Sequence, residues 1–153
     1  MGTILKDYSY TPAKINRGYS GKSLYINVSD LRIEQKEITD FMKEKFTGGK
    51  GFDLWYLWHA VTPETRWDSP ENEIVMSVGP IGGITQYSGT GKTLVCSISP
   101  LTDIPIDSNV GGYFGPLLKF SGWDAFELQG KSEKEILIFI DGNNGKIQIE
   151  SAE

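Results

Sequence analysis

One stretch of the sequence, SNVGGYFGPLLKFSGWDAFELQGKS at residues 108–132, places a glycine pair before a short apolar segment that runs straight into alternating residues. A glycine turn before apolar residues is typical of a helix start, and the alternation that follows is typical of a strand. Two interpretations of Gly111 and Gly112 are open. The pair is either a plain tight turn or a place where free backbone N–H groups bind an anion.

The residue types around the pair are compatible with a ligand. Free N–H groups and the positive end of the helix dipole favour an anion such as a phosphate at a helix N-terminus. Glycine lets a ligand approach the backbone closely. Asn109 offers an amide or main-chain oxygen to a hard cation such as Mg²⁺. From these residues alone, the plain turn remains the favoured interpretation.

Length and charge limit the class of protein. With 153 residues, the chain is long enough to form one domain with a buried core. The formal net charge of −5 at pH 7 argues against nucleic acid or an anionic membrane as the main partner. We find no apolar run near 18 residues and no signal peptide at the start, so we expect a cytoplasmic protein. The 18 glycines indicate many sharp turns or close backbone contacts.

Hydrophobic periodicity predicts an α+β fold with a mixed or antiparallel β-sheet and two or three packed helices. We expect residues 1–18 to form an N-terminal arm and residues 19–153 to form a single domain. A half-buried strand is predicted at 23–29, pairing with 31–35. Helices are predicted at 38–46, at 51–61 (apolar nearly all round and therefore buried) and at 113–120. The other strands are expected at 73–80, 93–99, 124–130, 135–141 and 146–151.

The segment GTGKT at residues 89–93 resembles half of a nucleotide-binding P-loop. The complete loop needs a glycine five positions before Gly91, where this chain has Gln86, and a helix where we expect a strand. A hairpin or loop turn is the simpler prediction. A second hypothesis for this segment is a glycine-rich loop from which Lys92 points at an anionic ligand. For the whole protein, an unrelated small-ligand or nucleotide binder remains a further hypothesis.

Single residues that could carry chemistry give weaker indications. His59 is the only histidine and is expected in the core with Trp55 and Trp58. Without a second histidine or a pair of cysteines, a self-contained zinc site is excluded. Cys96 lies in a predicted strand and is expected to be a buried structural thiol. No carboxylates have the spacing of an acid/base pair, so we assign no catalytic residue.

Four blocks of the sequence are similar to the N-terminal domain of the aldehyde ferredoxin oxidoreductase family. The blocks are YSGKSLYINVS, GGKGFDLWYL, SPENEIVMSVGP and SPLTDIPIDSNVGGYFGPLLKFSGWDAFELQGKSEKEILIFID. Their order and spacing agree with the family from Tyr19 onward. The run NxGGYFG, LK, GWD and GK is the most specific part. The resemblance implies that this chain corresponds to about the first half of that domain.

The resemblance also implies an activity and a cofactor. Members oxidise aldehydes to acids with ferredoxin as acceptor, and some relatives reduce aromatic thioesters. Tungsten, or sometimes molybdenum, is held by two pterin dithiolenes whose phosphates are bridged by magnesium, near a 4Fe–4S cluster. In the family's pattern, the residue at Asn109 ligates the magnesium and the residue at Gly111, next to Gly112, contacts the pterin. Lys92 replaces a family arginine between pterin and cluster; it keeps the charge but not the planar fork.

The departures from the family matter equally. The cluster cysteines, the catalytic pocket and a second glycine-rich pterin motif are absent from this sequence. The resemblance therefore implies a chain that cradles one face of the cofactor, completed by a larger chain or by self-association, as a split-gene subunit or part of a longer enzyme. A partner would also cover apolar or β-edge surface. The alternative is a scaffold or interaction subunit of a redox complex that no longer binds the cofactor.

Overall fold

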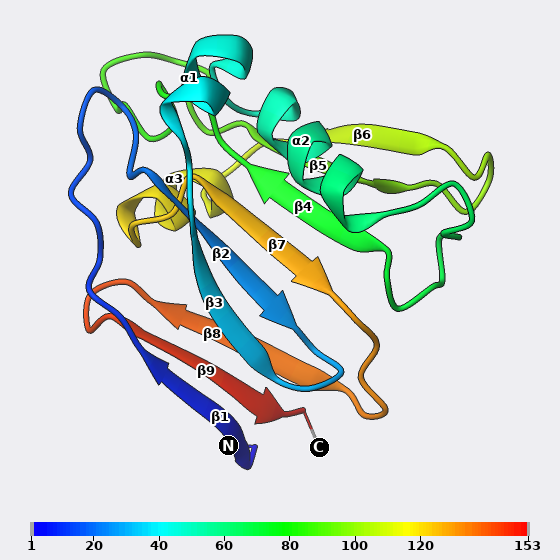
Figure 1. Cartoon of the computed structure of the whole chain (residues 1–153). Helices are drawn as coiled ribbons and strands as arrows, with labels where there is room; N and C mark the ends of the chain where they lie inside the picture. Colours follow the sequence, from blue (N-terminus) through cyan, green and yellow to red (C-terminus); the bar gives the residue numbers. More distant parts are fainter. Residues whose placement is uncertain (1, 153) are drawn as a thin grey trace.

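The computed structural model describes residues 2–152, which form two stacked β-sheets with helices α1 and α2 on one outer face (Figure 1). The larger sheet has the strand order β3-β2-β7-β4-β5-β6, and the smaller sheet has the order β1-β9-β8. The strands are β1 Ile4–Ser9, β2 Lys22–Asn27, β3 Arg32–Glu37, β4 Glu73–Ser77, β5 Thr93–Ile98, β6 Pro105–Val110, β7 Ala125–Gln129, β8 Ile136–Asp141 and β9 Lys146–Ser151. The helices are α1 Asp40–Phe46, α2 Lys50–Ala60 and α3 Phe114–Phe120.

Strand β2 makes the larger sheet mixed. It pairs antiparallel with β3 and parallel with β7, so Tyr25 stands opposite Glu34 on one side and Glu127 on the other. The predicted α+β class, with a mixed sheet and two or three helices, is confirmed. The prediction that β2 is half-buried was wrong, because the smaller sheet covers one of its faces and the helical layer covers the other.

The N-terminal residues lie against the rest of the fold. Strand β1 pairs antiparallel with β9, which brings the two ends of the chain side by side (Figure 1). Tyr10 is buried against Trp123, with ring centroids 4.8 Å apart, and its hydroxyl donates to the Ser121 carbonyl oxygen. Residues 1–18, which we expected as an arm, thus contain a strand of the smaller sheet and a core side chain. The mostly exposed sequence ILKDYS gave no clear alternation from which to predict that strand.

Apolar side chains fill both faces of the larger sheet. The cluster between the two sheets includes Leu24, Ile26, Trp123, Ile147 and Ile149. The cluster beneath α1 and α2 includes Ile38, Met42, Phe52, Leu57 and Cys96. Cys96 is buried as predicted, and burial raises the pKa of its thiol to about 12. None of the helices in the described part of the chain is long and apolar enough to span a membrane.

Helix α2 presents only one side to the sheet. Phe52 and Tyr56 are buried on that side, whereas Trp58 is 80% exposed and His59 is exposed. The predictions that α2 is buried all round and that Trp58 and His59 are core residues were wrong. Apolar residues cover most of the helix circumference, but the sheet can contact only one side of the helix. Trp55 is half-buried.

A buried ion pair joins the N-terminal region to the connection between α3 and β7. Lys119 is 1% exposed and Asp124 is fully buried, and the ammonium and carboxylate are in direct contact. Asp124 also accepts hydrogen bonds from the backbone N–H groups of Ser20, at 3.1 Å, and Gly21, at 2.7 Å. The ammonium of Lys119 donates to the Gly18 carbonyl oxygen at 2.7 Å. Lys119 and Asp124, which belong to the LK and GWD motifs of the sequence, therefore have a structural role.

Removing the charge of Asp124 would leave the Lys119 ammonium buried without its counter-ion. We expect Asp124→Asn to lower the free energy of unfolding by about 3–5 kcal/mol, as is typical when one partner of a buried ion pair is lost. Urea denaturation measures this change. The control Asp68→Asn alters an exposed carboxylate and should stay within about 0.5 kcal/mol of the wild type. Equal effects of the two variants would contradict the described role of the pair.

Candidate functional site

A glycine-lined hollow of about 320 Å³ lies at the beginning of helix α2. The connection between α1 and α2, the loop after β4 and the loop before β5 form its walls. Its glycines are those at positions 48, 49, 79, 82 and 89. Because glycine has no side chain, a ligand in the hollow would lie directly against backbone N–H and C=O groups.

The N-terminus of α2 opens at this hollow. Gly49 precedes the helix with φ +57° and provides no side-chain cap for its first N–H groups. The hydroxyl of Ser77 donates to the Gly49 carbonyl oxygen at 2.8 Å and fixes the turn. Lys50 also lines the hollow, and its ammonium lies 2.6 Å from the Asp107 carboxylate on β6. The helix dipole favours an anionic group here, and Lys92 also lines the hollow.

Two of the predicted cofactor residues lie at this place, one in the loop directly before β5 and the other on the neighbouring strand β6. Lys92 lines the hollow directly. Asn109 belongs to strand β6, which the sequence did not predict, and stands opposite Leu94 of β5. Opposite residues project from the same face of a sheet, and Leu94 lines the hollow, so Asn109 belongs to the same face. Its exposed amide makes no hydrogen bond to any residue that the structure describes.

The other two predicted residues, Gly111 and Gly112, follow β6 and adjoin the loop that carries Lys92. A Cβ placed on Gly91 would lie 2.6 Å from the Gly112 carbonyl oxygen, so the two backbone segments touch. A Cβ on Gly111 or Gly112 would meet nothing within 4 Å. The structure thus brings the four residues to one edge of the larger sheet, although the glycine pair lies outside the lining of the hollow itself.

The helix N-terminus at the hollow is that of α2, whereas the sequence had directed attention to the start of α3. Helix α3 has only seven residues, and Tyr113 caps it rather than the glycine pair. Sequence reasoning missed Gly48, Gly49 and Lys50 as candidate site residues. The GGKGFDLWYL block has the same pattern as the segment at Gly111, a glycine pair before an apolar helix. That pattern could have identified these residues. The GTGKT segment leads directly into strand β5, so the prediction that it is not a P-loop is confirmed.

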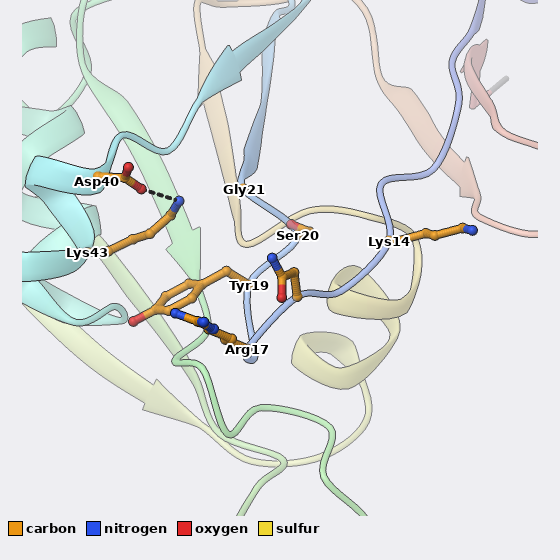
Figure 2. Close-up of a pocket in the computed structure, with 8 residues that line it drawn as sticks. Lys14, Arg17, Tyr19, Ser20, Gly21, Asp40 and Lys43 are labelled. Atoms are coloured by element: carbon orange, nitrogen blue, oxygen red, sulfur yellow. Dashed lines mark hydrogen bonds and ion pairs between the residues drawn. The ribbon is translucent and has the colours of Figure 1, made fainter.

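A larger cavity, of about 540 Å³, lies elsewhere, between the N-terminal loop and α1 (Figure 2). Within it, the Lys43 ammonium is 3.0 Å from the Asp40 carboxylate, and the Lys14 side chain points away from the other labelled residues. The Tyr19 hydroxyl donates to the Thr47 carbonyl oxygen at 2.5 Å. None of the four predicted cofactor residues lines this cavity, so size alone does not identify the site.

The contact between Gly91 and Gly112 can be tested by adding a single methyl group. Gly91→Ala places a Cβ against a carbonyl oxygen, and we expect the free energy of unfolding to fall by about 1–3 kcal/mol. Gly111→Ala adds the same group in open space, without a left-handed φ, and should change stability by no more than about 0.5 kcal/mol. Urea denaturation compares the two variants. Equal losses would show that the two segments do not touch as described.

Comparison with known proteins identifies the family. The family model described as the aldehyde ferredoxin oxidoreductase N-terminal domain matches residues 23–153, and the chain belongs to this family. Tungsten-containing aldehyde ferredoxin oxidoreductases from Pyrococcus horikoshii and Pyrococcus abyssi are 37% and 35% identical over 131 residues. These residues are 86% of this chain and 21% of each relative, so the chain spans about a fifth of their length. The resemblance inferred from the sequence is confirmed.

A solved structure supports the same fold. The active site complex BamBC of benzoyl coenzyme A reductase, in complex with 1,5-dienoyl-CoA, matches with a TM-score of 0.82 and 30% identity. The match covers 88% of this chain and 20% of that chain. The WOR-like subunit of an aliphatic sulfonate oxidoreductase from Pyrococcus furiosus is 28% identical over 88% of this chain and 21% of its own length. Because these relatives are named for different substrates, the shared domain alone does not identify a substrate.

Proposed function

We propose that this chain forms part of the cofactor cradle of a tungsten- or molybdenum-pterin oxidoreductase that oxidises aldehydes with ferredoxin as acceptor. The observation that carries the proposal is the meeting of Lys92, Asn109 and open glycine backbone at one sheet edge, beside the hollow. Membership of the family supports it. We assign no catalytic residue to this chain and propose a cytoplasmic location.

Each residue has a defined task in the proposal. Asn109 would give an oxygen, from its amide or its main chain, to the magnesium ion of the cofactor, because magnesium prefers oxygen ligands. Gly111 and Gly112 let the pterin approach the backbone, and Lys92 places a positive charge toward the anionic cofactor. When bound, the metal and its pterins supply the redox chemistry, while these residues bind and orient them.

The N-terminus of α2 extends this cradle. Its uncapped N–H groups, after Gly49, open at the hollow that Lys92 also lines. A phosphate there would receive backbone hydrogen bonds together with the positive end of the helix dipole. The ammonium of Lys50 also lies at the rim, where the Asp107 carboxylate compensates its charge. We therefore place the phosphate end of the cofactor on the α2 side of the site.

The remaining cofactor ligands and the 4Fe–4S cluster are proposed to lie outside this sequence. A larger chain with the other oxidoreductase domains, or a second copy of this chain, would complete the site, and ferredoxin would be an indirect partner. The exposed surface supports such a partner, because β6 is an edge strand and apolar side chains on it and on α3 are exposed. These side chains are Ile106, Val110, Phe114, Leu117 and Phe120.

A scaffold subunit that binds no cofactor is the second candidate. The observation that favours it is the ion pair between Lys50 and Asp107, which already compensates one of the cations at the hollow. A lysine at position 92, in place of the family's arginine, also lacks the planar fork that contacts an anion through two hydrogen bonds. The two candidates differ in one measurable property, which is the metal and pterin content of the assembled protein.

Gly111→Val in the assembled protein, produced in its natural host, separates the two candidates. The branched side chain would occupy the open space that the pterin needs, so we expect tungsten or molybdenum and pterin content to fall at least about tenfold. Elemental analysis and pterin fluorescence measure this loss. Ser108→Val adds the same side chain to β6, the strand that leads into Gly111, on the face away from Asn109, and should leave the content unchanged.

Asn109→Ala, measured in the same experiment, tests which oxygen of Asn109 binds magnesium. It lowers magnesium content only if the side-chain oxygen, and not the main-chain oxygen, is the ligand. Circular dichroism and thermal denaturation check that each variant is folded. Full metal content in a folded Gly111→Val protein would contradict the cradle and favour the scaffold.

A further inference from the structure

The cavity of about 540 Å³ between the N-terminal loop and α1 is lined by more cations than carboxylates (Figure 2). The cations are Lys14, Arg17 and Lys43, and the carboxylate is that of Asp40. The chain as a whole has a net charge of −5, so this local excess of positive charge runs against its composition. The wall formed by residues between 14 and 21 precedes the part that the family model matches, so family membership alone does not account for it.

Arg17 lies at the tip of a tight turn. The Asn16 backbone N–H donates to the Tyr19 carbonyl oxygen at 2.7 Å, and the Tyr19 N–H donates to the Asn16 carbonyl oxygen at 3.0 Å. Between them, Arg17 has φ +51° and Gly18 has φ +86°. Two successive left-handed residues are typical of a type I′ turn, which prefers asparagine followed by glycine. Arginine at the first of these positions is unfavourable, because its Cβ crowds the following carbonyl oxygen.

The turn is fixed to the rest of the fold by the two residues that follow its tip. The Gly18 carbonyl oxygen accepts a hydrogen bond from the buried Lys119 ammonium at 2.7 Å. A Cβ on Gly18 would lie 2.3 Å from the Pro80 carbonyl oxygen, so the turn lies directly against that loop. The Tyr19 hydroxyl donates to the Thr47 carbonyl oxygen at 2.5 Å. The residue at the tip is therefore presented on a rigid backbone, which lowers the entropy cost of binding.

The guanidinium of Arg17 has no ion pair or hydrogen bond with any residue among 2–152. Figure 2 shows its side chain extending in the same direction as the Tyr19 ring, toward the α1 side of the cavity, whereas Lys14 points away. An unpaired surface arginine alone would need no explanation. Here, however, the backbone adopts an unfavourable conformation at the residue that presents this charge, which indicates a role for the side chain.

The opposite wall of the cavity contributes a second cation. The Lys43 ammonium lies 3.0 Å from the Asp40 carboxylate and 5.8 Å from the centroid of the Tyr19 ring. The Asp40 side chain is fully exposed, so water screens this ion pair and the carboxylate holds the ammonium only weakly. An anion with more than one negative charge could therefore attract Lys43 as well as Arg17.

We propose that this cavity binds a phosphate group, with Arg17 as the main contact and Lys43 as the second. A phosphate carries nearly two negative charges at neutral pH, and a guanidinium can bind it through two parallel hydrogen bonds. The cavity is much larger than one phosphate ion and lies within the range of small-molecule sites, which favours the phosphate of a small organic molecule resting against Tyr19. None of the four predicted cofactor residues lines the cavity, so the inference does not depend on the proposed cradle.

Isothermal titration calorimetry of the protein with phenyl phosphate tests the inference. Near pH 7.5 and in about 0.1 M NaCl, which screens distant charges, we expect saturable binding. Benzoate carries the same ring with a single negative charge and should bind at least about fivefold more weakly. Inorganic phosphate, titrated in parallel, distinguishes the two sources of the group. An ester that binds at least about fivefold more tightly than the free ion assigns an organic phosphate, and equal affinities assign free phosphate.

Three variants separate a binding role of Arg17 from a structural one. Arg17→Asn removes the charge and creates the asparagine–glycine pair that the turn prefers, so phenyl phosphate should bind at least about tenfold more weakly while the melting temperature rises. Asp40→Asn removes the carboxylate that competes for Lys43 and should tighten binding about two- to fivefold. Lys14→Gln alters the cation that points away from the cavity and should keep the affinity within about twofold of the wild type.

Four results would overturn the inference. One is the absence of saturable binding with both phenyl phosphate and inorganic phosphate. Another is a folded Arg17→Asn variant whose affinity equals that of the wild type or of Lys14→Gln. The third is weaker binding in Asp40→Asn, because that would make the carboxylate a contact of the ligand. The fourth is benzoate binding as tight as that of phenyl phosphate, which would assign a carboxylate in place of a phosphate.

Discussion

The buried contact between Lys119 and Asp124 determines how the parts of the candidate site are placed. Asp124 binds the backbone just before β2, and Lys119 lies in α3, which follows the glycine pair. The pair therefore links the start of β2 to the segment that begins at Gly111. A carboxylate this deeply buried is tolerated because two backbone N–H groups and an ammonium satisfy it. Together with the core side chain Leu118, that contact holds the helix after the glycine pair on the sheet.

Helix α2 separates two polar regions of different character. At its N-terminus, Gly49 and Lys50 open to a hollow lined by glycine and by Lys92. At its C-terminal end, a second cavity is lined by the carboxyl groups of Glu34, Glu73 and Glu127, and burial raises the pKa of Glu73. Apolar packing under the middle of the helix keeps the two regions apart. The same helix therefore borders the proposed phosphate site at one end and a polar cavity at the other.

The sequence predicted those features that depend on local pattern. Alternation in SLYINVS identified β2, and the glycine pair identified the segment that starts at Gly111. Strand β6 was missed because PIDSNV is an exposed edge strand with polar residues on both faces. Trp58 was misplaced because composition does not show which side of a helix meets a sheet. The position of Glu73 beneath α2 could not be predicted, because it depends on the pairing of β4 with β7.

Metal analysis of the native protein tests the central claim most directly. The protein containing this sequence would be purified anaerobically from its source, and tungsten, molybdenum and iron would be measured in every fraction that contains the chain. The account predicts tungsten or molybdenum together with iron, co-eluting with the chain and with any larger polypeptide that completes the site. A chain that elutes free of these metals, alone or with partners, would contradict the cofactor cradle and leave Gly111 and Gly112 as a turn.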